Sequence, residues 1–189
     1  MIKRIINKLK RIYFSHLTPN GKAEYLREKV YHMGKNVQLF TNSIGTEPYL
    51  ISIGDNVNVA AGVSFINHDV SIFNIGRLID SKEEQPLDKV GSITLDDNCM
   101  IGAYAILMPG CSVGKNSVIA AGSVVTKAVP DNEVWGGNPA KFIMTTEDYK
   151  DKLIELNKTY PWMKDGKMIV PQGSKDLIEM RVKFFFKDM

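Results

Sequence analysis

Cysteine is scarce in this chain, which has only Cys99 and Cys111 among 189 residues. Two cysteines cannot form the disulfide network of a small secreted domain, so a disulfide scaffold is excluded. Long apolar runs are missing as well, and none approaches the ~18 residues that span a bilayer. The N-terminal segment lacks the uninterrupted apolar core and small-residue cleavage site of a secretory signal. We therefore expect a cytoplasmic protein.

The chain also lacks a large excess of basic or acidic residues. The 24 basic and 21 acidic residues leave a net charge of +3, which is too even to indicate a nucleic-acid partner. Hydrophobic residues make up 44% of the chain and charged residues 24%. That composition and length predict one sizeable globular core and exclude wholesale disorder.

Residues 1–32 form a basic N-terminal segment. Five bases fall within the first eleven residues, well before the first acid, Glu24, and they alternate with aliphatic residues at helical spacing. These bases are Lys3, Arg4, Lys8, Lys10 and Arg11. We expect a helix whose apolar face docks on the body of the protein. The alternative is weak contact of residues 1–14 with an anionic membrane surface, peripheral to the inner face of the membrane.

The middle of the chain, residues 33–143, repeats every six residues. Nine positions in one phase are all apolar, namely Ile53, Val59, Phe65, Leu95, Ile101, Leu107, Val113, Ile119 and Val125. At this composition, chance gives such a run about once in 250 sequences after allowing for six phases. Four residues after eight of the nine comes a small or modest residue, and both cysteines fall at that position. The pattern therefore predicts that each unit forms a short strand and a tight turn. The apolar residue and the small residue of each unit should both be buried in a stacked core.

The repeat is interrupted over residues 70–92 and then resumes without slipping phase. We expect 24 residues, four whole units, to leave the coil as a loop, and such loops are usually functional. Residues 144–189 lack the repeat. They predict a helix over 146–159 and a second helix beginning at Ser174.

Two runs in this middle segment resemble the hexapeptide-repeat acetyltransferases. They are ISIGDNVNVAAGVSFINHD before the loop and ITLDDNCMIGAYAILMPGCSVGKNSVIAAGSVVTKAVPDNEVWGGNPAKFI after it. The nearest resemblance is to the galactoside/maltose O-acetyltransferases and the related capsule and lipopolysaccharide O-acetyltransferases. It implies an all-β core built as a left-handed parallel β-helix, a homotrimer, and acetyl-CoA held between subunits with no metal.

His68 is the histidine that lies within the repeat, at the start of the loop. Neutral imidazole can accept a proton from an attacking hydroxyl near pH 7. The family places its catalytic histidine at the matching point, so the resemblance implies that His68 is the general base. Asn67 and Asp69 flank it, and Glu47 lies about one coil earlier. We expect these three to orient the imidazole or to hold the acceptor.

The resemblance also implies a set of acetyl-CoA contacts. The backbone at Gly102 and Ala103 matches the position that donates to the oxyanion of the tetrahedral intermediate. The family's other coenzyme contacts match Ala121, Gly122, Thr126, Lys127 and Lys141. The two lysines are the candidates for binding phosphate groups.

The resulting hypothesis is an acetyl-CoA-dependent O-acetyltransferase. It would act on a hydroxyl of a sugar or polysaccharide precursor. One alternative keeps the donor but changes the acceptor to a nucleotide-sugar amine, serine or an antibiotic. A second is a zinc hydrase of the γ-carbonic anhydrase type, which is disfavoured because His16 and His32 precede the regular repeat. A third is a non-catalytic scaffold.

Overall fold

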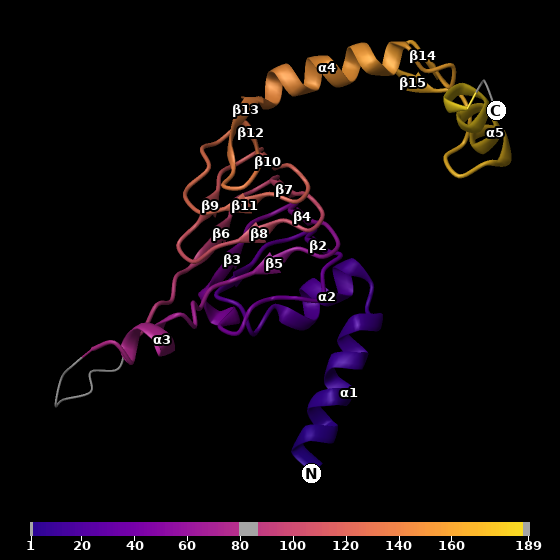
Figure 1. Ribbon diagram of the computed structural model, residues 1–189. Coiled ribbons are helices and arrows are strands. Elements are labelled where there is room, and N and C mark those ends of the chain that lie inside the picture. Colours follow the sequence, from indigo (N-terminus) through magenta and orange to yellow (C-terminus); the bar gives the residue numbers. More distant parts are fainter. Residues whose placement is uncertain (1, 80–86, 187–189) are drawn as a thin grey trace. The chain divides into compact units, whose positions relative to one another are not determined.

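The computed structural model describes residues 2–79 and 87–186. The chain divides into two compact units, residues 1–146 and residues 147–189. The first unit is dominated by a stack of short strands, while helices and one hairpin make up the second (Figure 1). Among the described residues, no helix is both long enough and apolar enough to cross a membrane.

Successive strands of the first unit fall in turn on three sheets, which we call sheets A, B and C. Sheet A contains β1 (His32–Met33), β3 (Ile51–Ile53), β6 (Ile93–Leu95) and β9 (Ser112–Val113). Sheet B contains β2 (Gln38–Leu39), β4 (Asn58–Val59), β7 (Met100–Ile101), β10 (Val118–Ile119), β12 (Glu133–Gly136) and β13 (Lys141–Thr145). Sheet C contains β5 (Ser64–Phe65), β8 (Ile106–Leu107) and β11 (Val124–Val125). All the pairs are parallel except β12 with β13, which confirms the predicted parallel β-helix.

The core of this coil is the one that the six-residue period predicts. All nine apolar positions of the repeat are at most 1% exposed. The small positions are buried between them, and they are Val57, Val63, Cys99, Ala105, Cys111, Ser117, Ser123 and Val129. Cys99 precedes a strand of sheet B and Cys111 precedes a strand of sheet A, so the two thiols lie on different sides of the coil. Large and small side chains therefore alternate within one narrow interior.

The turns between the sheets stack into three corners, named by the sheets they join. The AB corner comprises 54–57, 96–99 and 114–117; the BC corner comprises 60–63, 102–105 and 120–123; the CA corner comprises 66–69, 108–111 and 126–129. Asparagines at the AB corner have φ near +58°, a conformation that asparagine tolerates better than most residues. Their side chains form a ladder, in which Asn98 donates to Asn116 and Asn116 donates to Asn132, both at 2.8 Å.

The interruption of the repeat leaves the coil at the CA corner and contains α3 (Ile72–Gly76). Asp55 and Asp97, which stack across it, are 42 residues apart in sequence. Asn98 and Asn116, one ordinary coil apart, are separated by 18 residues. The difference is the predicted 24 residues, so the strand register is kept across the insertion. Residues 80–86 of the expected loop lie outside the described residues.

The N-terminal segment forms α1 (Ile2–His16) and α2 (Pro19–Leu26), and the Thr18 hydroxyl accepts a hydrogen bond from the Gly21 N–H at the start of α2. The expectation that the apolar face of α1 docks on the body was wrong. Its aliphatic side chains Ile5, Ile6, Leu9 and Ile12 are 45–59% exposed. The ring contacts between α1 and α2 that the described residues make lie at the C-terminal end of α1, where Tyr13 and Phe14 meet Tyr25. Phe14 at this end packs against the buried core, so the last turn is where α1 is attached to the body.

The second unit contains α4 (Thr146–Lys158, of which Thr146 still belongs to the first unit), β14 (Met163–Lys164), β15 (Lys167–Met168) and α5 (Lys175–Phe185). The Ser174 hydroxyl accepts a hydrogen bond from the Leu177 N–H at the start of α5. The centre of the unit is an aromatic cluster in which Tyr160 stacks on Trp162 and Phe184 meets both rings edge-on. These contacts hold the hairpin and α5 together.

Candidate active site

His68 lies at the CA corner, where the chain leaves the coil. The two sides of the insertion are hydrogen-bonded at this point. His68 forms an antiparallel bridge with Val90, and the N–H of Asp69 donates to the Lys89 carbonyl at 2.8 Å. On the other side, the N–H of Gly91 donates to the Asn67 carbonyl at 3.0 Å. The backbone that carries His68 is thus fixed from both directions.

Two carboxylates flank the imidazole of His68, one at each ring nitrogen. Glu47 Oε1 lies 3.6 Å from Nδ1, and Asp88 Oδ1 lies 3.6 Å from Nε2. Nε2 is buried and has no hydrogen-bond partner among the described residues. Carboxylates beside both ring nitrogens stabilise the imidazolium that forms when His68 accepts a proton.

The coil spacing predicted that Glu47 would stack near His68, and the structure places the two side by side. Asn67 is responsible for this placement. Its side-chain oxygen accepts a hydrogen bond from the Glu47 N–H at 3.2 Å, and its side-chain nitrogen donates to the Glu47 carbonyl. Gly45 passes so close that a Cβ there would lie 2.8 Å from the Asn67 side-chain oxygen. Asn67 is 1% exposed, so its side chain positions Glu47 rather than reaching outward.

The Asp69 side chain, like that of Asn67, interacts with other residues of the protein. Its carboxylate is 2.6 Å from Lys89 Nζ and accepts a hydrogen bond from the Ser71 N–H at 3.0 Å. Lys89 first, and then Ser71, lower the pKa of Asp69 to about 2. In this arrangement Asp69 closes the base of the insertion.

Sequence reasoning missed two neighbours of His68. Asp88 belongs to the returning strand of the insertion, where no periodicity indicates which residue will face the coil. Tyr49 follows Glu47 in a short 3₁₀ turn, η1 (Pro48–Leu50). A hydrogen bond to Glu47, together with desolvation and the negative charges of Glu47 and Asp88, raises the pKa of Tyr49. This phenol therefore stays protonated and donates to the carboxylate that faces His68.

The predicted coenzyme residues are divided between two corners of the coil. Thr126 and Lys127 belong to the CA corner, as His68 does, whereas Ala103, Ala121 and Gly122 belong to the BC corner. Sheet C separates the two groups. One chain therefore does not bring all of these residues into a single cluster, although two copies facing each other could do so.

At the expected oxyanion position, the two backbone N–H groups differ. The Gly102 N–H already donates to the Ile119 carbonyl at 2.8 Å. The Ala103 N–H has no acceptor among the described residues. Of the pair, Ala103 is therefore the available donor.

Lys127 and Lys141 are both exposed. Lys127 Nζ lies 5.2 Å from the centre of the Trp135 ring, a cation–π distance. Lys141 opens β13, directly after a turn fixed to β11: the Ala140 N–H donates to the Val124 carbonyl, and the Val124 N–H donates to the Gly137 carbonyl. Both ammonium groups are thus mounted on rigid parts of the coil and remain open to an anionic ligand.

A hollow of about 450 Å³ adjoins His68. It is lined by the loop over residues 42–46, by the end of β5 and the residues up to His68, and by Arg11 of α1. Its volume is within the range of small-molecule sites. This hollow combines a proton-accepting group with polar backbone and a cation, so we take it as the candidate acceptor side of the site.

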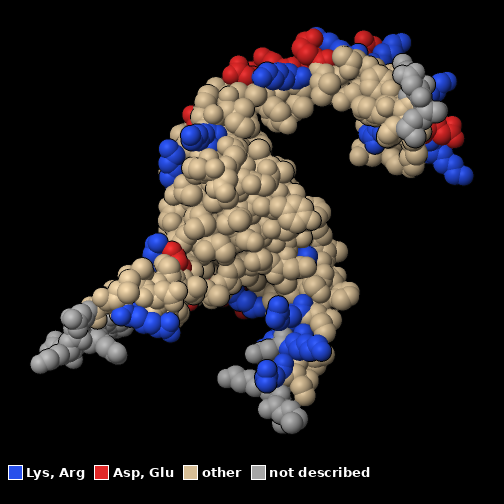
Figure 2. Space-filling model, in the orientation of Figure 1, with Lys and Arg blue, Asp and Glu red and all other residues tan. Residues whose placement is uncertain are grey.

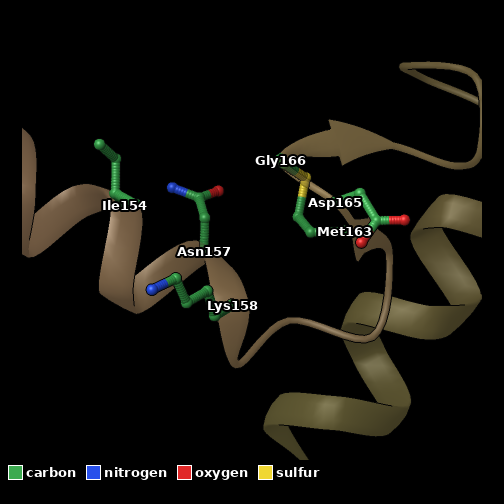
Figure 3. A pocket seen from close by; sticks show the side chains of 6 residues that line it. All are labelled: Ile154, Asn157, Lys158, Met163, Asp165 and Gly166. Atoms are coloured by element: carbon green, nitrogen blue, oxygen red, sulfur yellow. The ribbon is translucent and has the colours of Figure 1, made fainter.

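Other candidate sites in the structure have fewer groups that could take part in a reaction. A cavity of about 620 Å³ in the second unit lies between α4 and the β14–β15 hairpin, with Ile154 and Asn157 on one side and Met163 on the other (Figure 3). It contains no histidine or cysteine. Burial raises the pKa of Cys99 to about 12 and that of Cys111 to about 11, so neither thiol supplies a thiolate nucleophile. Within residues 2–79 and 87–186, no three His, Cys, Asp or Glu side chains are grouped as metal ligands would be.

Comparison with known proteins places this architecture in a family. Residues 92–127 match the family described as bacterial transferase hexapeptide (six repeats). Protein CapG of Staphylococcus aureus is 35% identical over 150 residues, which cover 78% of this chain and 84% of that protein. Galactoside O-acetyltransferase of Escherichia coli K12 is 35% identical over 128 residues, which cover 64% of this chain but only 56% of the relative. A solved galactoside acetyltransferase in complex with coenzyme A has the same fold, with a TM-score of 0.54 and 23% identity over 89% of this chain and 88% of that one. The chain therefore belongs to the hexapeptide-repeat acetyltransferases.

Proposed function

We propose that this protein transfers the acetyl group of acetyl-CoA to a hydroxyl group of a sugar or polysaccharide precursor. The observation that carries the proposal is the His68 imidazole, which lies between the carboxylates of Glu47 and Asp88 and lines a hollow of substrate size. A sugar hydroxyl is the acceptor best supported, because the galactoside relative is an O-acetyltransferase. No feature of the described residues favours an amine acceptor over it.

The reaction needs one proton acceptor and no covalent enzyme intermediate. Nε2 of His68 removes the hydroxyl proton as the oxygen attacks the thioester carbonyl. The bond from carbon to sulfur then breaks, and the departing sulfur takes the proton from the imidazolium. Glu47 and Asp88 stabilise the positive charge of the imidazolium, while Asn67 and Tyr49 hold Glu47 in place. Binding both substrates in one groove supplies much of the rate.

The division of site residues between two corners supports a homotrimer, with the left-handed coil that family membership implies. His68 and Lys127 of one subunit would face Ala103, Ala121 and Gly122 of its neighbour. The free Ala103 N–H would then donate to the developing oxyanion. Lys127 and Lys141 would bind the phosphate groups of the coenzyme, and Thr126 would contact it beside Lys127.

The test measures release of free CoA thiol from acetyl-CoA in the presence of a panel of mono- and oligosaccharides. Replacing the base with alanine, His68→Ala, should lower kcat by on the order of 10²–10⁴-fold while leaving coenzyme affinity unchanged. His32→Ala is the matched control, because His32 is an exposed histidine of β1. If His68→Ala retained activity within about tenfold of the wild type, His68 would not be the general base.

A further inference from the structure

Arg11 is the cation of the hollow that contains His68, and it is contributed by α1 rather than by the coil. No ion pair joins Arg11 to an acidic side chain in the described ranges. It is exposed at the mouth of a site that has to bind a substrate. An unpaired guanidinium at that place is suited to a bidentate contact with an anionic oxygen pair.

The position of Arg11 is fixed by the end of α1 that does pack. Phe14, one turn further along, lies 5.4 Å from Tyr25 between ring centres, and Tyr13 lies 6.0 Å from the same ring. Lys22 Nζ is 5.8 Å from the Phe14 ring on the same side. These contacts attach the last turns of α1 to α2 and hold Arg11 beside residues 42–46.

The basic surface continues along α1. Arg4, Lys8 and Arg11 follow one another at spacings of four and three residues, which places them on one face of the helix. Together with Ile12 they line a second hollow of about 370 Å³, and Arg11 lines both hollows. The sequence of α1 contains no acidic residue, and Figure 2 shows basic side chains gathered in the region of this helix. Three neighbouring cations are suited to a ligand with more negative charge than the single charge of a carboxylate.

We propose that Arg11, with Lys8 and Arg4 behind it, binds the diphosphate of a diphosphate-linked sugar, so that the sugar lies in the hollow beside His68. This inference rests on the proposed function, since it names the chemical class of the acceptor. Diphosphate-linked sugars occur on nucleotides and on polyprenyl lipids. The exposed aliphatic side chains Ile5, Leu9 and Ile12 favour the lipid, because an apolar helix face that carries bases suits a membrane interface.

The test measures calorimetric binding of inorganic diphosphate to the wild-type protein and to Arg11→Gln. CoA carries a diphosphate of its own, so an empty coenzyme site could also bind the inorganic diphosphate. Saturating CoA is therefore present throughout to fill that site. Arg11→Gln should weaken binding by on the order of 10- to 100-fold, as expected for loss of a charge-assisted contact. Lys35→Gln is the control, because it removes the same charge from an exposed position between β1 and β2 and should leave binding unchanged.

Two further arms distinguish the sources. Binding of UDP-glucose that depends on Arg11 would indicate a nucleotide-linked acceptor. Cosedimentation with phosphatidylcholine vesicles that contain farnesyl diphosphate, if lost in Arg11→Gln, would indicate the lipid. Equal binding of diphosphate by the wild type and Arg11→Gln, or no binding by either, would overturn the inference. A separate titration of CoA into each protein checks the donor site, so failure of the proposed function itself would be recognised by a failure to bind CoA.

Discussion

The side chain of Asn67 holds the backbone of Glu47 from both sides, accepting from its N–H and donating to its carbonyl. Asn67 thereby links the coil position before His68 to a loop one coil earlier. The carboxylate of Glu47 reaches Nδ1 of His68 because of this link. A residue that the sequence suggested for substrate contact thus acts, in the structure, on the geometry of the base.

The first prediction concerns this link. Asn67→Ala leaves the partly buried Glu47 N–H without its acceptor and removes one of the two donors to the Glu47 carbonyl, which still accepts from the Leu50 N–H, so it should destabilise the fold by about 1–3 kcal/mol. It should also lower kcat with little change in KM for acetyl-CoA, since the imidazole loses its orienting carboxylate. Asn74→Ala, at an exposed position of α3, is the control. Unchanged kcat in a folded Asn67→Ala protein would argue against the positioning role.

The second prediction concerns acid stability at the base of the insertion. Lys89 is the main cause of the lowered pKa of Asp69, about 2. A carboxyl pKa below its unfolded value stabilises the fold above about pH 4, and that contribution is lost as the pH falls towards about 2. The stability difference between the wild type and Lys89→Met should therefore narrow on acidification through this range, as read from urea midpoints. A difference that stayed constant or widened would contradict the pairing, and Lys35→Met should show no such narrowing.

The third prediction concerns the BC corner, where Tyr104 occupies with φ +60° the position filled by glycine in neighbouring coils. A Cβ at Gly62, itself at φ +73°, would lie 2.5 Å from the Tyr104 ring. Gly62→Ala should therefore cost about 1–2 kcal/mol for its backbone conformation and more for displacing the ring. Gly110→Ala is the matched control, because its φ is +80° but nothing lies near its Cβ. Equal losses in the two variants, measured by chemical denaturation, would show that the ring contact has no energetic weight.

The fourth prediction concerns the donor site. If Lys127 binds the 3′-phosphate of the coenzyme, Lys127→Ala should weaken CoA on the order of tenfold while changing the affinity for dephospho-CoA little. Calorimetry with the two ligands separates these contributions. Equal weakening of both ligands would place Lys127 away from that phosphate.

The coil was predictable from sequence because its determinants are local and periodic. The six-residue spacing that includes Ile53 and Leu95 indicates that both side chains are buried. This spacing continues in phase after the insertion, because the insertion has the length of whole units. The surroundings of His68 were only partly predictable. Glu47 follows from coil stacking, whereas Asp88 comes from the non-periodic return of the insertion and leaves no signal. The exposure of Ile5 and Leu9 was not predictable, because an amphipathic pattern indicates an apolar face without indicating what covers it.

The central claim is that the coil binds an acetyl donor, and calorimetric titration of CoA into the wild-type protein tests it most directly. We predict micromolar binding. Absence of binding at millimolar CoA, by protein shown to be folded and trimeric, would contradict the account and leave the coil as a scaffold for some other ligand.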